Sequence, residues 1–478
     1  MKKYTIIIFL IVAPFTFGQT PIDSIKAIIK QEVTNKRSKS IIIGIVDANG
    51  RQIVAEGQLS DNDSRLPDGN TIYEIGSITK VFTSLLLADM NLKQQVNVHD
   101  PISKFLPGTV KTPIRKGKEI SLLSLSTHRS AMPRFPYNTD PKNLDEPYID
   151  YSVNQLYEYV AHFEPSFDID SKWQYSNVAY GVLGTVLTLV AQKNFEALMT
   201  DEICKPLHLN NTVISLTSKQ KENLAIGHAE TGTKVGLTEL GAIEAGGALR
   251  SNVNDLLTFA EENMGLIKTE LFPAMELTHV LQAKKDGNDT YTTMGWTLDN
   301  NDGQNLLFKD GGMPGYCTFL GIDNKNKIGV VVLSNSNNSV SDIGRYILDS
   351  RHKIEPYQYP WQLLDTLRKT VQSKGINAAI ALYYQLKTAK NPELLFNENQ
   401  LNYLAGELRK SGKTKQAIKL YELNVKEYPS AVLANESLGE IYKRTKKKKM
   451  AIIYFEKARE LDPQNPHWNY ILDKLKKH

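Results

Sequence analysis

The C-terminal part of this 478-residue chain repeats itself with a period of 34 residues. The small residue Ala417 and the aromatic Tyr421 recur as Ala451 and Phe455. The other matching positions are Leu404, Leu408 and Pro429 in the first copy, and Leu438, Tyr442 and Pro463 in the second. Self-similarity at this period is typical of paired helices that stack, because one pair alone cannot bury its apolar face. This part of the chain is therefore predicted to be helical almost throughout.

The repeat resembles the tetratricopeptide repeat, with two clear copies and a degenerate one near Ala378 to Leu386. The resemblance implies a small all-α, tetratricopeptide-like solenoid. The usual function of such a solenoid is to bind a protein partner on its concave surface. The alternative is that so short an array only packs on the rest of the chain.

A change of pattern separates this array from the residues before it. The segment Ile354 to Gln362, IEPYQYPWQ, contains two prolines and clustered aromatic residues, which break the helical pattern. Residues from Trp361 to the end carry a net charge of +10, whereas residues 19–360 carry −7. We therefore predict two domains, at 19–355 and 361–478. The basic array either faces an acidic surface or presents a solvated face.

The first residues, MKKYTIIIFLIVAPFTFGQT, have the layout of a secretory signal peptide. Lys2 and Lys3 precede an apolar stretch, Tyr4 to Phe17, that is too short for a comfortable membrane span. We expect residues 1–18 to be cleaved after Gly18 and the protein to be exported to a bacterial periplasm or secreted. No transmembrane segment is then expected. An uncleaved anchor is the alternative.

Composition is that of a globular protein, with 41% hydrophobic and 23% charged residues. Only Cys204 and Cys317 provide thiols, and they lie far apart in the sequence. An exported chain of this size can build its core without disulfides. Two free thiols are therefore predicted.

Strand patterns lie at both ends of the first domain. The sequence SIIIGIVDANGRQIVAEGQ predicts a hairpin that turns at Asp47 to Gly50. Residues Tyr316 to Ile322 and Lys327 to Leu333 predict a second hairpin. The patterns between them are mostly helical, as in Lys80–Leu92, Val153–Phe163, Val178–Gln192 and Val253–Met264. One antiparallel sheet built from both ends of the domain, covered by helices and joined to a helical lobe, is the expected α+β architecture.

The stretch YEIGSITKVF places Ser77 three residues before Lys80 at a predicted helix start. Residues i and i+3 share one helix face, so the lysine can stand beside the serine and activate its hydroxyl. Free N–H groups at the helix start could stabilise an oxyanion. The alternative is that Ser77 is an ordinary helix cap.

Other hydrolytic and nucleotide chemistries find no support in the sequence. There is no G-x-S-x-G elbow, no H-E-x-x-H pair and no G-x-x-x-x-G-K-[ST] loop. The nine histidines are scattered, so a metal site is not expected. No cofactor or nucleic-acid site is evident, because the basic array has no stacking or groove-reading motif.

Two more motifs follow in order along the chain. WQYSNVAYGVLG contains Tyr175 and Asn177, and LFKDGGMPGYCTFLGI contains Lys309 two residues before Gly311. The succession S-x-x-K, Y-x-N and K-x-G resembles the serine β-lactamase and penicillin-binding-protein superfamily, and the Y-x-N is similar to its class C branch. The likeness runs from about Ile22 to Ser350 and includes the flanking segments THRSAMPR, CKPLHLNNT and GGALRSNVNDL.

The resemblance implies the fold of that superfamily and a role for each motif residue. Ser77 is the expected nucleophile, and either Lys80 or Tyr175 is its base. We favour Tyr175 as the base in acylation and as the activator of the deacylating water. It would need neighbouring cations, which Lys80 and Lys309 could supply, to ionise near neutral pH. Asn177 would hold Lys80 and bind a substrate carbonyl.

The oxyanion hole would be formed by the backbone N–H groups of Ser77 and Gly312. Gly311 and Gly312 would leave room for substrate along the strand edge. His128 is interpreted as a turn residue of a loop that lines the helical lobe.

Asp310 departs from the pattern, because β-lactamases and D-Ala carboxypeptidases usually carry a hydroxyl residue there. A carboxylate that points into the cleft would repel the carboxylate of a penicillin or a C-terminal D-Ala. This would favour esters, amides or substrates with a free amine. The alternative is that Asp310 turns outward.

The sequence therefore predicts an exported serine hydrolase that uses an acyl-enzyme on Ser77 and acts on an ester, amide or D-amino-acid-containing peptide. One alternative is a β-lactamase or D-Ala carboxypeptidase. Another is a weakly catalytic binding or sensor protein that passes a signal through the repeats. A pure scaffold would require all these motifs to be relics.

Overall fold

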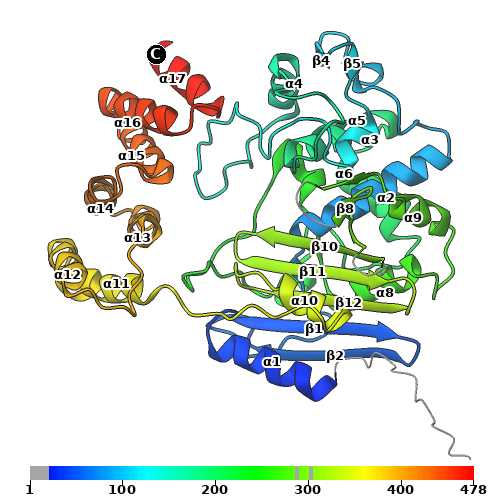
Figure 1. Ribbon diagram of the computed structural model, residues 1–478, viewed down its shortest axis with the longest axis horizontal. Helices are drawn as coiled ribbons and strands as arrows, with labels where there is room; N and C mark the ends of the chain where they lie inside the picture. Colours follow the sequence, from blue (N-terminus) through cyan, green and yellow to red (C-terminus); the bar gives the residue numbers. More distant parts are fainter. Residues whose placement is uncertain (1–20, 286–289, 301–304, 478) are drawn as a thin grey trace, which may run out of the picture.

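The computed structural model describes residues 21–285, 290–300 and 305–477. The predicted signal peptide, residues 1–18, lies outside them. Two units are visible in Figure 1. Residues 21–353 contain an antiparallel sheet and are called the sheet unit below, and residues 362–477 form the helical array. No helix in the described part of the chain is long and apolar enough to cross a bilayer.

The sheet unit is built on eight strands in the order β2-β1-β12-β11-β10-β9-β8-β7, all antiparallel. Strands from the two ends of the unit are direct neighbours, since Ile43 in β1 pairs with Val332 in β12. The predicted hairpins and the single sheet are confirmed. The strands are β1 (Ser40–Asp47), β2 (Gly50–Gly57), β7 (Ala283–Lys284), β8 (Thr290–Thr292), β9 (Thr297–Asp299), β10 (Leu306–Met313), β11 (Tyr316–Asp323) and β12 (Ile328–Ser334).

Both faces of the sheet are covered, which explains why β1 is an almost unbroken apolar run. Ile41 and Ile43 pack under helices α1 (Ile22–Thr34) and α10 (Ser341–Leu348). Gly44 points to the other face, where a Cβ would lie 2.4 Å from a Val253 methyl group. On that side lie α2 (Thr79–Leu92), α8 (Val253–Asn263) and α9 (Phe272–His279).

The remaining helices of the sheet unit form a lobe above the sheet (Figure 1). Its centre is α5, an apolar helix that is buried on all sides from Val178 to Leu187. The lobe contains α3 (Leu122–Ser126), α4 (Val153–His162), α5 (Asn177–Ala191), α6 (Phe195–Met199) and α7 (Ser218–Glu222), with short helical turns η2 (Ile102–Lys104), η3 (Thr200–Cys204) and η4 (Gly241–Gly246). Two-stranded pairs complete it: β3 (Tyr73–Glu74) with β6 (Arg250–Ser251), and β4 (Ile114–Arg115) with β5 (Lys118–Glu119). Cys204 and Cys317 are free thiols, as predicted.

The helical array forms a curved row beside the sheet unit, drawn from yellow to red in Figure 1. Its small repeat residues Ala417 and Ala451 are fully buried between paired helices. The helices are α11 (Gln362–Lys374), α12 (Ile376–Ala389), α13 (Glu398–Lys410), α14 (Thr414–Glu427), α15 (Val432–Arg444), α16 (Lys448–Leu461) and α17 (His467–Lys477). The region is all-α, as predicted. Its tetratricopeptide-like character and the domain limits 19–355 and 361–478 stay predictions.

Candidate active site

Ser77 lies in a tight 3₁₀ turn, η1 (Gly76–Ile78), that leads into α2. Gly76 has a φ of +52°, and a Cβ there would lie 2.7 Å from the backbone nitrogen of Gly312. Only glycine combines this conformation with this close approach. The turn therefore presses Ser77 against the end of β10.

The Ser77 hydroxyl does not cap the helix, and among the described residues no side chain of the N-cap position caps α2 or η1. Its oxygen lies 2.5 Å from the Tyr175 hydroxyl oxygen and 3.1 Å from Lys80 Nζ. The geometry therefore departs from the helix-cap alternative and brings the three predicted residues into direct contact.

Lys80 is completely buried. Its Nζ lies 2.8 Å from Asn177 Oδ1 and 2.5 Å from the Gly246 carbonyl oxygen, and no carboxylate of the described residues lies within ion-pair distance. Burial, with the nearby charges of Lys309 and Arg134, lowers the Lys80 pKa well below its usual value. Lys80 donates to the two carbonyl oxygens and to the Ser77 hydroxyl. The lowered pKa favours the neutral amine, whose lone pair could accept the Ser77 proton.

Tyr175 is also enclosed, and burial raises its pKa to about 12. The Ser77 hydrogen bond and Arg134 act in the opposite direction but are outweighed. Lys80 Nζ and Lys309 Nζ lie 4.9 and 5.1 Å from the centre of its ring. The phenol therefore keeps its proton at neutral pH but has two amines beside it.

Asn177 is free to hold Lys80 because its neighbour Ser176 caps α5, accepting a hydrogen bond from Ala179 N at 2.9 Å. His128 packs against this segment. Its Nδ1 accepts a hydrogen bond from Ser176 N at 3.2 Å, and its ring centre lies 4.5 Å from that of Tyr175. Burial lowers the His128 pKa well below its usual value, so His128 acts as a neutral support.

The strand β10 presents an open edge to Ser77, because β9 pairs with it only from Leu306 to Phe308. Lys309 is buried on this part of the strand, and burial with the nearby charge of Lys285 lowers its pKa to about 8. At Gly311, a Cβ would lie 2.0 Å from the Ile75 carbonyl oxygen. Glycine is thus needed for β10 to lie against the turn that carries Ser77.

Asp310 lies on the opposite face of β10 from Lys309. It is exposed and in register with Phe319, which packs under α10. Its carboxylate is not among the groups that line the cleft at Ser77. Its charge still reaches the site, because it raises the pKa of Tyr175. The geometry therefore matches the outward alternative, with an influence on the site at longer range.

A cleft of about 530 Å³ opens beside Ser77. Asn177 and Gly312 line it near the nucleophile, and two residues of the helical array, Tyr403 and Lys410, line it on another side. The remaining lining residues are Arg134, Phe135, Pro147, Tyr148, Ala229, Val235, Thr238, Leu240, Ile243, Gly246, Gly247, Met313, Pro314, Gly315 and Asn337.

The sequence motifs missed some of these residues. Gly246 and Arg134 lie in flanking segments that share the character of the resembled superfamily, so comparison along those segments is a signal that could have found them. Nothing in the sequence connects Tyr403 or Lys410 with Ser77, because the motif pattern ends before the array begins.

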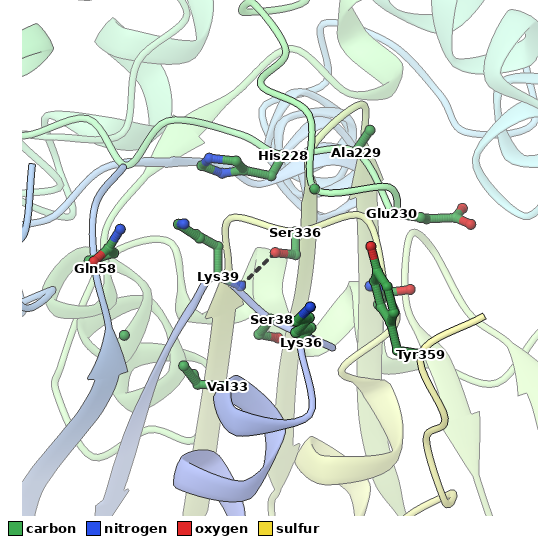
Figure 2. Close-up of a pocket in the computed structure, with 13 residues that line it drawn as sticks. Val33, Lys36, Ser38, Lys39, Gln58, His228, Ala229, Glu230, Ser336 and Tyr359 are labelled. Atoms are coloured by element: carbon green, nitrogen blue, oxygen red, sulfur yellow. Dashed lines mark hydrogen bonds between the residues drawn. The ribbon is translucent and has the colours of Figure 1, made fainter. Parts of the chain in front are cut away.

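A second cavity, of about 350 Å³, lies near the ends of β1 and β12 (Figure 2). Its Ser336 accepts a hydrogen bond from Lys39 N at 2.7 Å, and the Lys39 amine is paired with Asp61. His228 lines it, but burial lowers the pKa of its ring. No residue pair here matches the activated serine of the first cleft.

The chain is similar to proteins of known family. The family model described as Beta-lactamase matches residues 25–351. A D-alanyl-D-alanine-carboxypeptidase/endopeptidase, AmpH, from Escherichia coli strain K12 is 24% identical over 303 residues, which cover 60% of this chain and 77% of that protein. A beta-lactamase from Pseudomonas fluorescens is 26% identical over 326 residues, covering 60% and 86%.

Solved structures show the same fold. The crystal structure of a class C beta lactamase from Rhodobacter sphaeroides superposes with a TM-score of 0.60 at 19% sequence identity. The match covers 69% of this chain and 99% of that one. The predicted class C β-lactamase-like fold is therefore confirmed.

Proposed function

This chain belongs to the beta-lactamase family and is a serine hydrolase of that kind; we propose that it is exported and that Ser77 forms the acyl-enzyme with an ester, amide or D-amino-acid-containing peptide. The observation that carries the proposal is the hydrogen-bonded row Tyr175–Ser77–Lys80–Asn177. A lysine without a carboxylate partner, held beside a serine, has no evident structural purpose and is suited to activate a nucleophile.

In the acylation step, Lys80 takes the proton of Ser77 while the oxygen attacks the substrate carbonyl. The oxyanion of the tetrahedral intermediate is stabilised by the backbone N–H groups of Ser77 and Gly312. Tyr175 gives its proton to the leaving oxygen or nitrogen as the bond breaks. The products of this step are the acyl-enzyme, a phenolate and the ammonium of Lys80.

In the deacylation step, the Tyr175 phenolate takes a proton from water, and the resulting hydroxide attacks the acyl carbonyl. Ser77 leaves as an alkoxide and regains its proton from Lys80. The charges of Lys80 and Lys309 stabilise the phenolate between the two steps. All groups return to their starting states.

This assignment gives the first proton to Lys80, whereas the sequence analysis favoured Tyr175 as the acylation base. The directions of the two pKa values support the change, because burial lowers the pKa of the Lys80 amine and raises that of the Tyr175 phenol. Tyr175 keeps the role of activating the deacylating water.

An aryl acetate and a penicillin distinguish the candidate substrate classes. We expect the purified protein to hydrolyse p-nitrophenyl acetate and the Ser77→Ala variant to lose at least a thousandfold in rate. Ser218→Ala, an exposed serine at the start of α7, is the matched control and should keep full activity. A Ser77→Ala variant as active as the wild type would refute the nucleophile.

A fluorescent penicillin tests the alternative that the protein is a β-lactamase or D-Ala carboxypeptidase, which the names of its relatives suggest. We expect weak covalent labelling because the negative charge of Asp310 acts on the site at longer range and disfavours a second carboxylate. Asp310→Asn and Asp310→Thr should both increase the labelling rate to a similar, modest extent, because each removes this charge; a larger increase in Asp310→Thr alone would show that the side chain at residue 310 reaches the substrate. Strong, rapidly cleared labelling of the wild type would instead support the β-lactamase.

The binding or sensor function stays a second candidate because the array could present a surface to a protein partner. If neither ester nor penicillin reacts at Ser77, this function becomes the stronger one.

A further inference from the structure

The helix α13 of the array forms one wall of the cleft at Ser77. Tyr403 and Lys410 both line this cleft. They are seven residues apart, which is two helical turns, so they project from the same face of α13. A residue on this wall can therefore contact a substrate that extends from Ser77 into the cleft.

Ion pairs fix this wall to the sheet unit through one loop. Asp145 accepts from Arg409 at 2.6 Å and lies 3.2 Å from Lys410 Nζ. Asp140 lies 2.8 Å from Lys443 Nζ and 2.5 Å from Lys474 Nζ.

The same loop continues into the cleft, since Pro147 and Tyr148 line it. Arg444 also donates to the Pro141 carbonyl oxygen at 2.7 Å. Because contacts from α13, α15 and α17 hold this loop, the array and the cleft wall form one continuous structure.

The charge of the lining is one-sided. Arg134 and Lys410 are its basic side chains, and no aspartate or glutamate of the described residues is among the groups that line it. Asp145 is shared between Arg409 and Lys410, so this cluster keeps one net positive charge. Arg134 packs its guanidinium 5.4 Å from the Tyr175 ring centre.

Much of the lining besides these two cations is apolar. Aromatic rings from both units and aliphatic side chains face the space: Phe135, Tyr148, Tyr403, Leu240, Ile243 and Met313. A largely apolar lining that also contains two cations suits a ligand that has an apolar segment and a negatively charged group.

We propose that Tyr403 and Lys410, together with Arg134, form a substrate subsite that selects an apolar segment carrying a carboxylate. The inference rests on the proposed serine hydrolase function and extends it. The helical array is then part of the active site and contributes to substrate specificity directly.

Matched esters test the subsite. The mono-p-nitrophenyl ester of octanedioic acid carries the proposed carboxylate, its methyl ester removes the charge, and p-nitrophenyl acetate does not extend into the subsite. We expect wild-type kcat/KM to be higher for the anionic ester than for its methyl ester. In Lys410→Met the rate for the anionic ester should fall about fivefold, the size expected for a partly exposed charge pair. Acetate hydrolysis should stay within twofold.

Three further variants separate a subsite from a structural role. Tyr403→Ala should lower kcat/KM for both long esters but not for acetate, because it removes apolar contact. Lys415→Met, an exposed lysine on α14, should change nothing. Asp145→Asn removes the anion that neutralises part of the cluster, so preference for the anionic ester should be kept or increased.

A binding measurement distinguishes failure of the subsite from failure of the catalytic proposal. Isothermal titration calorimetry of Ser77→Ala with octanedioate monomethyl ester should show binding. The dissociation constant should rise about fivefold in Ser77→Ala/Lys410→Met. Absent ester turnover together with this binding would refute only the catalytic proposal. Equal losses for acetate and the long esters in Lys410→Met, an unchanged anion preference, or no binding to Ser77→Ala would overturn the subsite.

Discussion

Lys80 in the sheet unit and Lys443 in the helical array are both largely enclosed, yet their surroundings are opposite. Lys80 contacts a hydroxyl and two carbonyl oxygens and has no carboxylate partner among the described residues. Lys443 lies between the carboxylates of Asp140 and Glu440, at 2.8 and 2.7 Å. The fold therefore gives one lysine an environment that disfavours its charge and the other an environment that requires it.

The same contrast extends to the other lysines of each region. Burial and neighbouring cations lower the pKa of Lys309, whereas a hydrogen bond to Asp140 raises that of Lys474. A buried amine without an anion is costly to maintain in its charged form, so its presence indicates chemistry. Lysines of the helical array that pair with carboxylates of the sheet unit indicate that the two units are held together there. Lysine content alone would not have separated these functions.

Removal of the Lys80 amine should have the largest effect and should break the contrast most clearly. We expect Lys80→Met to lower p-nitrophenyl acetate turnover at least about a thousandfold, because Ser77 loses its base. The midpoint of thermal unfolding should be unchanged or higher, since a desolvated amine is replaced by an apolar chain. Lys93→Met, on the exposed end of the same helix, is the matched control. Loss of folding with Lys80→Met would show that this lysine is structural.

The pH dependence should report the low pKa of Lys309. Its ammonium is present below a pKa of about 8 and is lost as the pH rises through that value. We expect kcat/KM for p-nitrophenyl acetate to decline by about tenfold above pH 8, because the Tyr175 phenolate loses a neighbouring cation. Protonation of Lys80 should cause a second decline at acidic pH.

A Lys309→Arg variant sharpens this assignment. Its guanidinium stays charged at all pH values of interest, so the alkaline decline should disappear. Lys205→Arg, an exposed lysine, should leave the pH profile unchanged. An alkaline decline that persists in Lys309→Arg would assign it to another group.

Removal of a carboxylate that pairs the sheet unit with the helical array should have the smallest effect. Asp140→Asn deletes the partner of Lys443 and Lys474 and should lower the free energy of unfolding by about 1 kcal/mol, the range for partly exposed ion pairs. Thermal unfolding and the rate of proteolysis in the segment 354–361 measure it. Asp23→Asn, on an exposed side chain, is the control.

The pairs of Asp140 depend on pH in a defined direction. Hydrogen bonds from Lys443 and Lys474 lower its pKa, so their contribution is present above the carboxyl's unfolded pKa of about 3.9 and is lost as the pH falls through its lower folded value. An unchanged unfolding midpoint and proteolysis rate in Asp140→Asn at neutral pH would contradict the attachment.

Local patterns predicted those elements whose physical cause is local. The apolar run of β1 reflects burial of one strand, and the turn before β2 reflects the backbone preferences of its own residues. The 34-residue spacing of Ala417 and Ala451 reflects the packing of each helix pair against the next. The short strands β7 to β9 were not predicted, because strands of two or three residues have too few positions for an alternating pattern. The motif residues were identified by order along the chain, but their hydrogen bonds were not.

The amino-acid sequence by itself determined the family, the order of the motifs and the helical character of the array. Only the tertiary structure decided that Lys80 has no carboxylate partner among the described residues, that Asp310 lies on the face of β10 opposite Lys309, and that α13 lines the cleft. The physical reason is that a pKa, the side to which a strand residue points and a wall between two units depend on residues far apart in the chain. Local sequence preferences carry no record of such neighbours.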